Sequence, residues 1–164
     1  MAVATEPMTD PAATTPWSYD EAFSRHNGLI SPQQQQKLRN SRVAIAGMGG
    51  VGGGHLATLA RLEITRFRIA DPDHYDLANI NRQYGASYST VGQPKVEVMA
   101  RIARDINPEI EVDAWERPLD KDNCHDFLDG VDVLLDGMDL LRTDVRRKVF
   151  NVAAEQGTHV VTAG

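Results

Sequence analysis

Short apolar runs alternate with segments of helical periodicity from residue 41 onward. The apolar runs are rich in Val, Ile and Leu, which is typical of buried strands, whereas Val98, Ile102 and Ile106 recur at the spacing of one helix face. We predict strands over 42–47, 67–71, 110–115, 131–136 and 159–162, and helices over 51–61, 94–106, 121–128 and 143–155. This alternation predicts an α/β fold, a Rossmann-like doubly wound, mostly parallel sheet with helices on both faces.

The chain divides into three parts, over 1–17, 18–40 and 41–164. The first is rich in Ala, Thr and Pro, so we expect a disordered or extended arm. The second contains two predicted short helices, over 19–25 and 32–39, and Ser31-Pro32 opens the later one as N-cap and first residue. The third is the α/β domain, which we expect to be truncated because Gly164 follows the last strand directly.

Composition narrows the choice of partner and compartment. A net charge of -6 argues against broad electrostatic binding of nucleic acid or an anionic membrane, although a local phosphate pocket remains compatible with it. No run of about 18 apolar residues is present, and the first 16 residues lack the basic start and apolar core of a signal peptide. Because Cys124 is the single cysteine, no internal disulfide can form, and we expect a cytoplasmic protein.

A glycine-rich loop joins the first predicted strand of the domain to its helix. Gly47-Met-Gly49-Gly50-Val-Gly52 fits the pattern GxGxxG, in which the first glycine permits a tight turn and the second lets backbone amides approach a phosphate. The last glycine allows helix and strand to pack closely, and the helix N-terminus attracts an anion. Asp71 ends the next strand, where a carboxylate accepts hydrogen bonds from ribose. The combination predicts nucleotide binding.

Further polar groups follow the strands, at the edge where such sheets bind ligands. They lie in Asp71-Pro-Asp73, in Asn79-Ile-Asn81-Arg82-Gln83, in Gly92-Gln-Pro-Lys95 and in Asp136-Gly-Met-Asp139. Arg82 and Lys95 are two cations within one crossover, as a triphosphate requires, and Asp139 is a carboxylate suited to Mg²⁺. Asp73 belongs to this predicted nucleotide-binding set, although an aspartate in this position is more typical of a turn or cap than of a ligand.

The motifs GxGGVG, D-x-D, N-x-NRQ, GQPK and DGxD, in this order, resemble the ThiF/MoeB/HesA family. This family is the bacterial relative of the ubiquitin-activating enzymes and includes a tRNA threonylcarbamoyladenosine dehydratase branch. The resemblance covers roughly residues 23–164. It implies an adenylyltransferase that uses ATP and Mg²⁺ to activate a carboxylate. That carboxylate would be the C-terminus of a ubiquitin-like carrier protein or part of a modified nucleoside, so the nucleic acid expected as a substrate is tRNA.

The resemblance also implies residue roles. Asp71 would bind ribose, Asn79 and Arg82 would line the triphosphate site, Lys95 would contact phosphate, and Asp139 would hold Mg²⁺. Ser24-Arg25-His26 is similar to an N-terminal motif whose arginine reaches the active site of the partner subunit, which makes Arg25 a candidate catalytic residue of a homodimer. The chain departs from the family at His26, where glutamine is usual, and at Leu140, where asparagine is usual.

Two other functions remain open. The glycine loop and Asp71 alone would also suit an NAD- or FAD-binding oxidoreductase, but a dinucleotide has no terminal triphosphate for Arg82, Lys95 and Asp139. The chain could also be a non-catalytic subunit that keeps the fold for dimerisation. The nearly complete set of predicted phosphate-site residues argues against that alternative.

Overall fold

The computed structural model describes residues 16–139 and 141–162, and the arm predicted over 1–17 falls almost wholly outside them. The domain is built on a parallel five-stranded sheet in the order β3-β2-β1-β4-β5. The strands are β1 (Arg42–Ala46), β2 (Arg66–Ala70), β3 (Glu111–Trp115), β4 (Val133–Asp136) and β5 (His159–Thr162). The predicted fold class is therefore confirmed.

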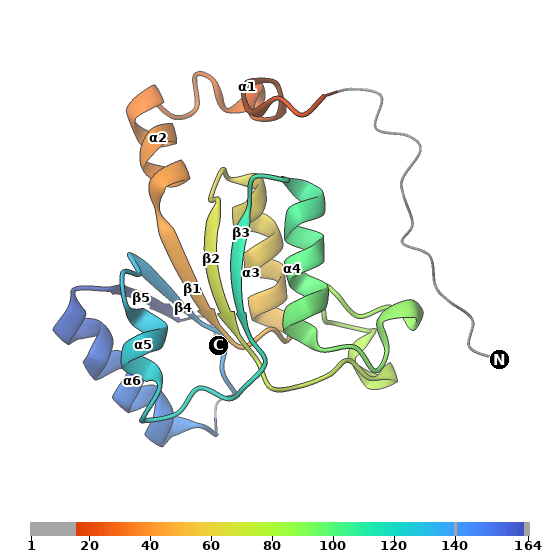
Figure 1. Cartoon of the computed structure of the whole chain (residues 1–164), viewed down its shortest axis with the longest axis vertical. Helices are drawn as coiled ribbons and strands as arrows, with labels where there is room; N and C mark the ends of the chain where they lie inside the picture. Colours follow the sequence, from red (N-terminus) through yellow and green to blue (C-terminus); the bar gives the residue numbers. More distant parts are fainter. Residues whose placement is uncertain (1–15, 140, 163–164) are drawn as a thin grey trace.

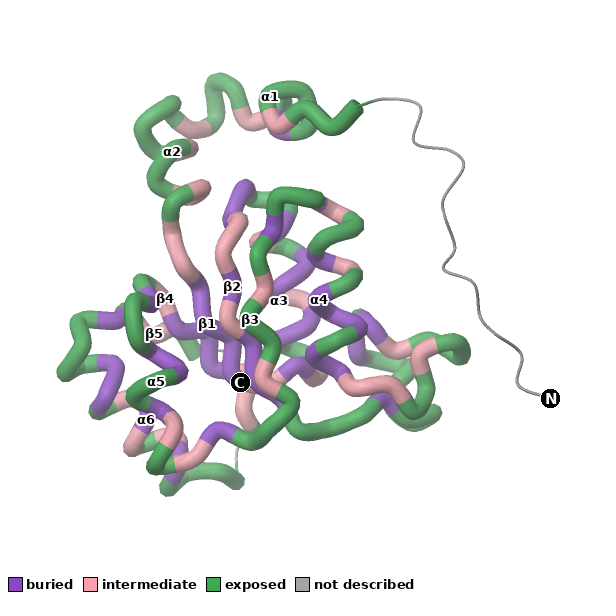
Figure 2. The backbone as a smooth tube through the Cα atoms, viewed as in Figure 1, coloured by how far each residue is buried: buried purple, intermediate pink, exposed green. Residues whose placement is uncertain are grey.

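Helices cover the sheet in two layers (Figure 1). They are α3 (Gly50–Arg61) and α4 (Lys95–Ile106) on one face, with α5 (Cys124–Leu128) and α6 (Thr143–Gln156) on the other. Alternate residues of β1 divide between the layers: Val43 and Ile45 pack towards α3 and α4, whereas Ala44 and Ala46 pack towards α5 and α6. The buried backbone in Figure 2 runs through this centre.

Strand order reverses at β1. The chain proceeds from β1 outward to β2 and β3 and then returns to β4 on the opposite side of β1. The connections that leave the carboxyl ends of β1 and β4 therefore diverge and leave a crevice between them. Gly47 follows β1 and Gly137 follows β4, so the glycine loop lies at this reversal.

Two predicted helices differ from the structure. The helix expected over 19–25 is interrupted, because α1 (Tyr19–Ala22) ends before a separate 3₁₀ turn, η1 (Ser24–His26). The helix expected from 121 begins only at Cys124. The reason is a turn in which the Asp120 carboxylate accepts hydrogen bonds from the backbone amides of Asp122 and Asn123, both at 2.9 Å.

Residues 18–40 form a separate layer beyond the amino ends of the strands, at the top of Figure 1. This N-terminal segment contains α1, η1 and α2 (Pro32–Asn40). Ser31 caps α2 in a reciprocal capping box with Gln34. The glycine loop lies at the opposite, carboxyl edge of the sheet.

Candidate nucleotide-binding site

The glycine loop has a backbone that only glycine fits at two positions. Gly47 has φ +92°, and a Cβ there would lie 2.8 Å from the Gly137 carbonyl carbon. A Cβ on Gly52 would overlap the carbonyl oxygen of Gly47. Gly49 is the N-cap of α3 and Gly50 its first residue, so the free amides of the first turn open at this edge. The loop therefore packs closely against its neighbours at Gly47 and Gly52, and the backbone amides at the start of α3 remain available as hydrogen-bond donors.

Asp71 connects this loop to the end of β2. Its side chain is buried, with Oδ2 accepting from the Met48 amide at 2.6 Å and Oδ1 from the Asp73 amide at 2.8 Å. Burial raises the pKa of Asp71, and the hydrogen bonds from the two amides oppose that rise. Each carboxylate oxygen still has acceptor capacity, so Asp71 can hold the loop and accept from a ligand hydroxyl.

Lys95 is a buried cation on the same side of the site. It is the first residue of α4, only 7% of its side chain is exposed, and its Nζ lies 3.0 Å from Oδ2 of Asp73. Asp73 itself is exposed. An ammonium group that is buried yet lines the cavity can bind an anion without ordering a mobile side chain.

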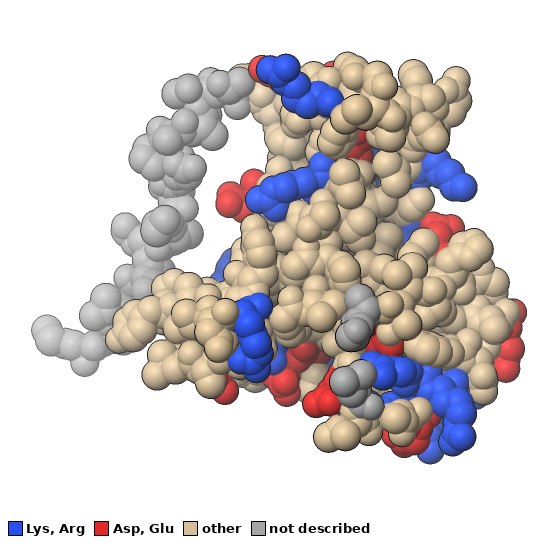
Figure 3. Space-filling model, turned by 180° about the vertical axis from the view of Figure 1, so that it is seen from behind, with Lys and Arg blue, Asp and Glu red and all other residues tan. Residues whose placement is uncertain are grey.

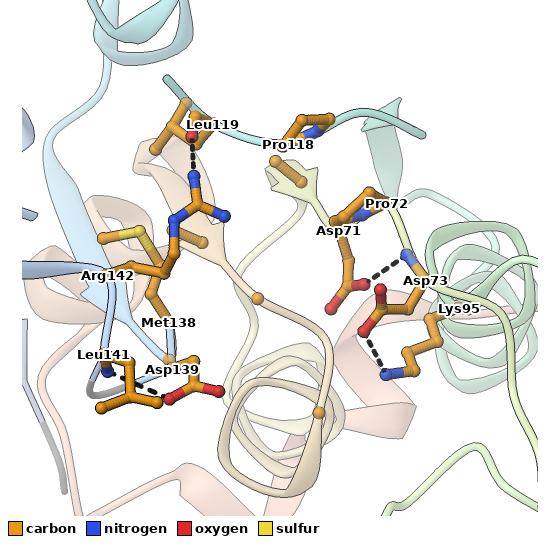
Figure 4. A pocket seen from close by; sticks show the side chains of 15 residues that line it. Asp71, Pro72, Asp73, Lys95, Pro118, Leu119, Met138, Asp139, Leu141 and Arg142 are labelled. Atoms are coloured by element: carbon orange, nitrogen blue, oxygen red, sulfur yellow. Dashed lines mark hydrogen bonds and ion pairs between the residues drawn. The ribbon is translucent and has the colours of Figure 1, made fainter. Parts of the chain in front are cut away.

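The opposite side of the site comes from the loop between β4 and α6. The Asp139 carboxylate accepts from the Leu141 amide at 3.1 Å, and Arg142 Nη2 donates to the Leu119 carbonyl oxygen at 3.3 Å. Figure 4 shows Arg142 and Asp139 facing Asp71 and Lys95 across the cavity, with Leu119 above. Two cations, Lys95 and Arg142, and three carboxylates, those of Asp71, Asp73 and Asp139, thus surround one space.

The cavity has a volume of about 410 Å³. This falls within the range of about 300–1,000 Å³ that small-molecule sites occupy. It opens at the strand reversal, because residues following β1, β2 and β4 line it together with the start of α4. A ligand here would contact both halves of the sheet, as nucleotides do in open α/β folds.

The donor set around Asp139 is compatible with a magnesium ion bound jointly with a nucleotide. Mg²⁺ usually takes one or two carboxylates and completes its octahedron with phosphate oxygens and water. Asp139 supplies one such carboxylate at the cavity wall. Asp136 is held instead in a buried ion pair, with its Oδ2 2.8 Å from Arg146 Nε. Within 16–139 and 141–162, no three acidic, histidine or cysteine side chains cluster as an all-protein metal site.

The predicted site residues fall into two groups. The structure brings Gly47, Gly49, Asp71, Asp73, Lys95 and Asp139 together around the cavity. Gly50 and Gly52 lie just behind them, in the first turn of α3. Three other predicted residues, Asn79, Arg82 and Arg25, do not line the cavity.

Asn79 and Arg82 lie in the crossover between β2 and α4. The Asn79 side chain is buried and accepts from the Asp76 amide at 3.1 Å in a capping box, so it stabilises the loop itself. The Arg82 guanidinium folds back onto this loop, where Nη1 donates to the Ala78 carbonyl at 2.8 Å and to Asn81 Oδ1 at 3.1 Å. The backbone carbonyl of Arg82 approaches α3 beside Gly50.

Arg25 lies in η1, within the N-terminal segment at the amino edge of the sheet. The cavity opens at the carboxyl edge, so Arg25 does not reach the site of its own chain. Its side chain is exposed, and within the described part of the chain it forms no hydrogen bond or ion pair.

Three residues that shape the site were given no role by the sequence. Arg142 lines the cavity although no motif singled it out. Gln83 is buried beside Gly49, and its Oε1 has no hydrogen-bond partner among the described residues. Arg146 pairs with Asp136 beneath the loop after β4. Arg142 is the N-cap residue of α6 and Arg146 is its fourth residue. The available signal was the position of these two arginines at the start of the predicted helix, soon after the motif Asp136-Gly-Met-Asp139.

Fold and cavity together define a nucleotide-binding α/β domain, and comparison with known proteins identifies its family. Residues 23–164 match the ThiF family. The chain belongs to this family. Residues of the chain are 44% identical over 121 positions to the tRNA threonylcarbamoyladenosine dehydratase of Bacillus subtilis, covering 73% of this chain and 47% of that protein. They are 34% identical over 162 positions to the probable adenylyltransferase/sulfurtransferase MoeZ of Mycobacterium tuberculosis, covering 94% and 39%.

Solved structures with the same fold support this family assignment. The Escherichia coli tRNA N6-threonylcarbamoyladenosine dehydratase in complex with ATP superposes with a TM-score of 0.84 at 28% identity, covering 89% of this chain and 60% of that one. Escherichia coli MccB, crystallised with AMPCPP and MccA, superposes with a TM-score of 0.79 at 25% identity, covering 90% and 44%. The chain spans about half the length of the curated relatives it matches.

Proposed function

We propose that this domain binds ATP with Mg²⁺ and transfers AMP to a carboxylate, forming an acyl-adenylate and releasing pyrophosphate. The observation that carries the proposal is the cavity at the strand reversal. There the buried Lys95 and Asp71 face Asp139 across the N-terminus of α3. A cation, a metal-binding carboxylate and free helix amides together suit a polyphosphate.

Each group has a proposed task. Asp71 accepts hydrogen bonds from the ribose hydroxyls, and the first amides of α3 bind phosphate oxygens. Lys95 neutralises charge on the phosphates, and Asp139 holds Mg²⁺, which supplies further charge stabilisation. Glycines 47, 49, 50 and 52 allow the backbone to approach the nucleotide.

The reaction needs little covalent chemistry from the protein. An oxygen of the acceptor carboxylate attacks the α-phosphorus, a new O–P bond forms, and the bond to the bridging oxygen breaks with its electron pair leaving on pyrophosphate. The nucleophile is already ionised, so no general base is required. The protein aligns the reactants and stabilises the charge that gathers on the leaving group.

Arg82 joins this site only when ATP is bound, in our proposal. Its guanidinium would leave the Ala78 carbonyl and turn towards the phosphates, while Asn79 keeps the crossover loop in shape. The exchange is favourable because a phosphate oxygen is a charged acceptor, and hydrogen bonds between charged groups are about twice as strong as neutral ones.

Arg25 would act across a homodimer. It lies at the sheet edge opposite the cavity of its own chain, which is compatible with delivery to a second copy. Mixing an Arg25→Ala chain with a Lys95→Ala chain should restore part of the activity, because one of the two mixed sites keeps both residues. A mixture as inactive as its parents would contradict action in trans.

The acceptor is proposed only as a class, either the C-terminus of a carrier protein or a carboxylate on a modified nucleoside in tRNA. The names of the relatives include both a tRNA threonylcarbamoyladenosine dehydratase and a sulfur carrier protein adenylyltransferase. On the face drawn in Figure 3, basic and acidic side chains are interspersed among the described residues. With a net charge of -6, tRNA would have to be recognised at a local site.

The test is ATP–pyrophosphate exchange, screened over carrier proteins and carboxylate-bearing nucleosides. Incorporation of labelled pyrophosphate into ATP with one acceptor class would support adenylation and identify that class. A chain that binds ATP but supports no exchange with either class would favour the non-catalytic dimerisation subunit. We also propose that the protein acts in the cytoplasm, because its single cysteine cannot form an internal disulfide. Within residues 16–139 and 141–162, none of the helices has the length and apolar character of a membrane span.

A further inference from the structure

Glu63 is the most unusual residue at the amino edge of the sheet. It follows α3 with φ +74°, and among the described residues it is the only non-glycine residue with positive φ. This conformation costs a residue with a Cβ about 1–2 kcal/mol. Glu63 is also completely buried, although glutamate is almost never fully buried unless it is paired. A strained and buried carboxylate requires a compensating interaction.

That compensation comes from three donors, all in the N-terminal segment. Tyr19 OH donates to Oε2 at 2.6 Å, Gln35 Nε2 donates to Oε1 at 3.1 Å, and His26 Nδ1 lies 2.5 Å from Oε1. The donors come from α1, α2 and η1, respectively. One carboxylate therefore fixes all three short helices of the segment to the domain.

The contact with Glu63 also affects the pKa of Tyr19. Burial is the largest cause of the raised pKa of Tyr19, and the hydrogen bond to Glu63 and the negative charge of Glu63 raise it further. The segment has other attachments, each to one of its helices: Arg39 Nη2 donates to the half-exposed Glu109 at 2.7 Å, Thr65 Oγ1 donates to the Arg39 carbonyl oxygen at 2.8 Å, and Leu38 packs against the core. Just before the segment, Trp17 Nε1 donates to Glu109 at 3.2 Å. Buried contacts are less weakened by water than exposed ones. Among the described residues of the domain, Glu63 alone hydrogen-bonds to all three short helices of the segment.

We infer that Glu63 is a positioning residue that anchors the N-terminal segment and thereby presents Arg25 to the nucleotide site of a second copy. His26, which contacts Glu63, is the next residue after Arg25 in the same 3₁₀ turn. The exposed guanidinium is thus attached to the domain through a neighbour whose ring is fixed. The part of this inference that concerns Arg25 rests on the proposed adenylation.

Glu63→Gly separates anchoring from general stability. Glycine adopts positive φ freely, so the backbone strain disappears while all three hydrogen bonds are lost. If Glu63 served only the stability of the fold, the relief of strain would offset the lost hydrogen bonds, and the order of residues 18–40 would change little. If Glu63 anchors the segment, residues 18–40 should become less ordered. Glu109→Gln is the matched control, because it weakens an exposed carboxylate contact to the same segment.

Backbone hydrogen exchange on the full-length chain measures the anchor directly. In Glu63→Gly, protection over 18–40 should fall by about tenfold or more, the loss expected from removing at least one charged hydrogen bond. Protection in β1, β2 and β4 should stay as in the native chain, and Glu109→Gln should change residues 18–40 by less than about threefold. Unchanged protection of 18–40 in Glu63→Gly would overturn the anchor, whether or not the protein adenylates.

Pyrophosphate exchange then tests the presentation of Arg25. Glu63→Gly should lower the rate at saturating ATP and leave ATP affinity unchanged, because the cavity is untouched. Mixing Glu63→Gly with Lys95→Ala chains should restore part of the rate, as expected for a residue that acts through Arg25 in trans. A looser segment with an unchanged rate, or with no restoration on mixing, would overturn the positioning role. Absence of exchange in the native chain would instead contradict the proposed function, with hydrogen exchange still deciding the anchor.

Discussion

The two edges of the sheet use charged side chains in opposite ways. At the amino edge, Glu63 is fully buried and bound by three donors from the N-terminal segment. At the carboxyl edge, Lys95 has one carboxylate partner, Asp139 accepts one backbone amide, and both face a cavity of about 410 Å³. A charged group whose hydrogen-bonding capacity is filled by protein groups attaches one part of the protein to another. A charged group at a cavity that can still form hydrogen bonds is available to a ligand.

The comparison predicts that substitutions at the carboxyl edge will affect chemistry and binding. Substitutions at the amino edge will affect the order of the segment.

Arg82→Ala should have the largest effect on rate. Arginine contacts to transferring phosphoryl groups are worth about 10³–10⁵ in rate, and we expect a loss of that order in pyrophosphate exchange by analogy. ATP affinity should fall much less, because the guanidinium must first leave the Ala78 carbonyl and its gain is realised in the transition state. Rapid-quench measurement of the rate with calorimetric binding of ATP checks this split. Equal losses in both would make Arg82 an ordinary binding residue.

Lys95→Ala should lower the exchange rate by about 10²–10³-fold, the usual cost of losing one preorganised charge-stabilising group. The side chain is already buried at the cavity wall, so ATP affinity should also fall. Asp73→Asn is the control, since it removes the charge that Lys95 contacts but leaves the ammonium in place. A rate as low in the control as in Lys95→Ala would mean that the ion pair matters rather than the cation.

Two glycines of α3 provide a matched pair for stability. Gly52→Ala would drive a Cβ into the Gly47 carbonyl oxygen and should destabilise the fold by about 2–3 kcal/mol, as overpacking of a tight site does. Gly54→Ala meets nothing within 4 Å and should stabilise the helix by up to about 1 kcal/mol. Urea unfolding of both variants measures the difference. A stable Gly52→Ala chain would contradict the loop geometry.

Asp71→Ala should weaken ATP binding by about 1–3 kcal/mol, the range for losing a charged hydrogen-bond partner. Asp126→Ala, on the exposed surface of α5, should leave the affinity unchanged. Isothermal calorimetry measures both constants. Native affinity in Asp71→Ala would exclude the ribose contact.

The smallest expected effect is a dependence on pH. Burial raises the pKa of Asp71, so its protonated form persists to higher pH than in a free aspartate. Protonation removes the charged acceptor, and ATP affinity should therefore fall as pH drops through this raised pKa. Asp71→Asn should lose that pH step while the rest of the profile remains. Identical profiles for the two chains would assign the step to another group.

The carboxyl edge could largely be predicted from sequence, because its geometry is local. A strand, the turn at Gly47 and the helix that begins at Gly50 are contiguous, and Asp71 directly follows the next strand. The amino edge could not be predicted in this way. Glu63 contacts Tyr19, His26 and Gln35 only after the chain folds back over 28 or more positions, and no periodicity marks a residue with positive φ. Arg142 was missed for a similar reason, since its partner Leu119 belongs to another loop.

The central claim is that the cavity at the strand reversal is an ATP site. Calorimetric titration of the native chain with ATP and Mg²⁺, and separately with NADH, tests it most directly, with Lys95→Ala as the reference. We predict that ATP binds with one site per chain, that NADH binds far more weakly, and that Lys95→Ala reduces only the affinity for ATP. Tighter binding of NADH than of ATP, with no effect of Lys95→Ala, would contradict it and favour the oxidoreductase alternative.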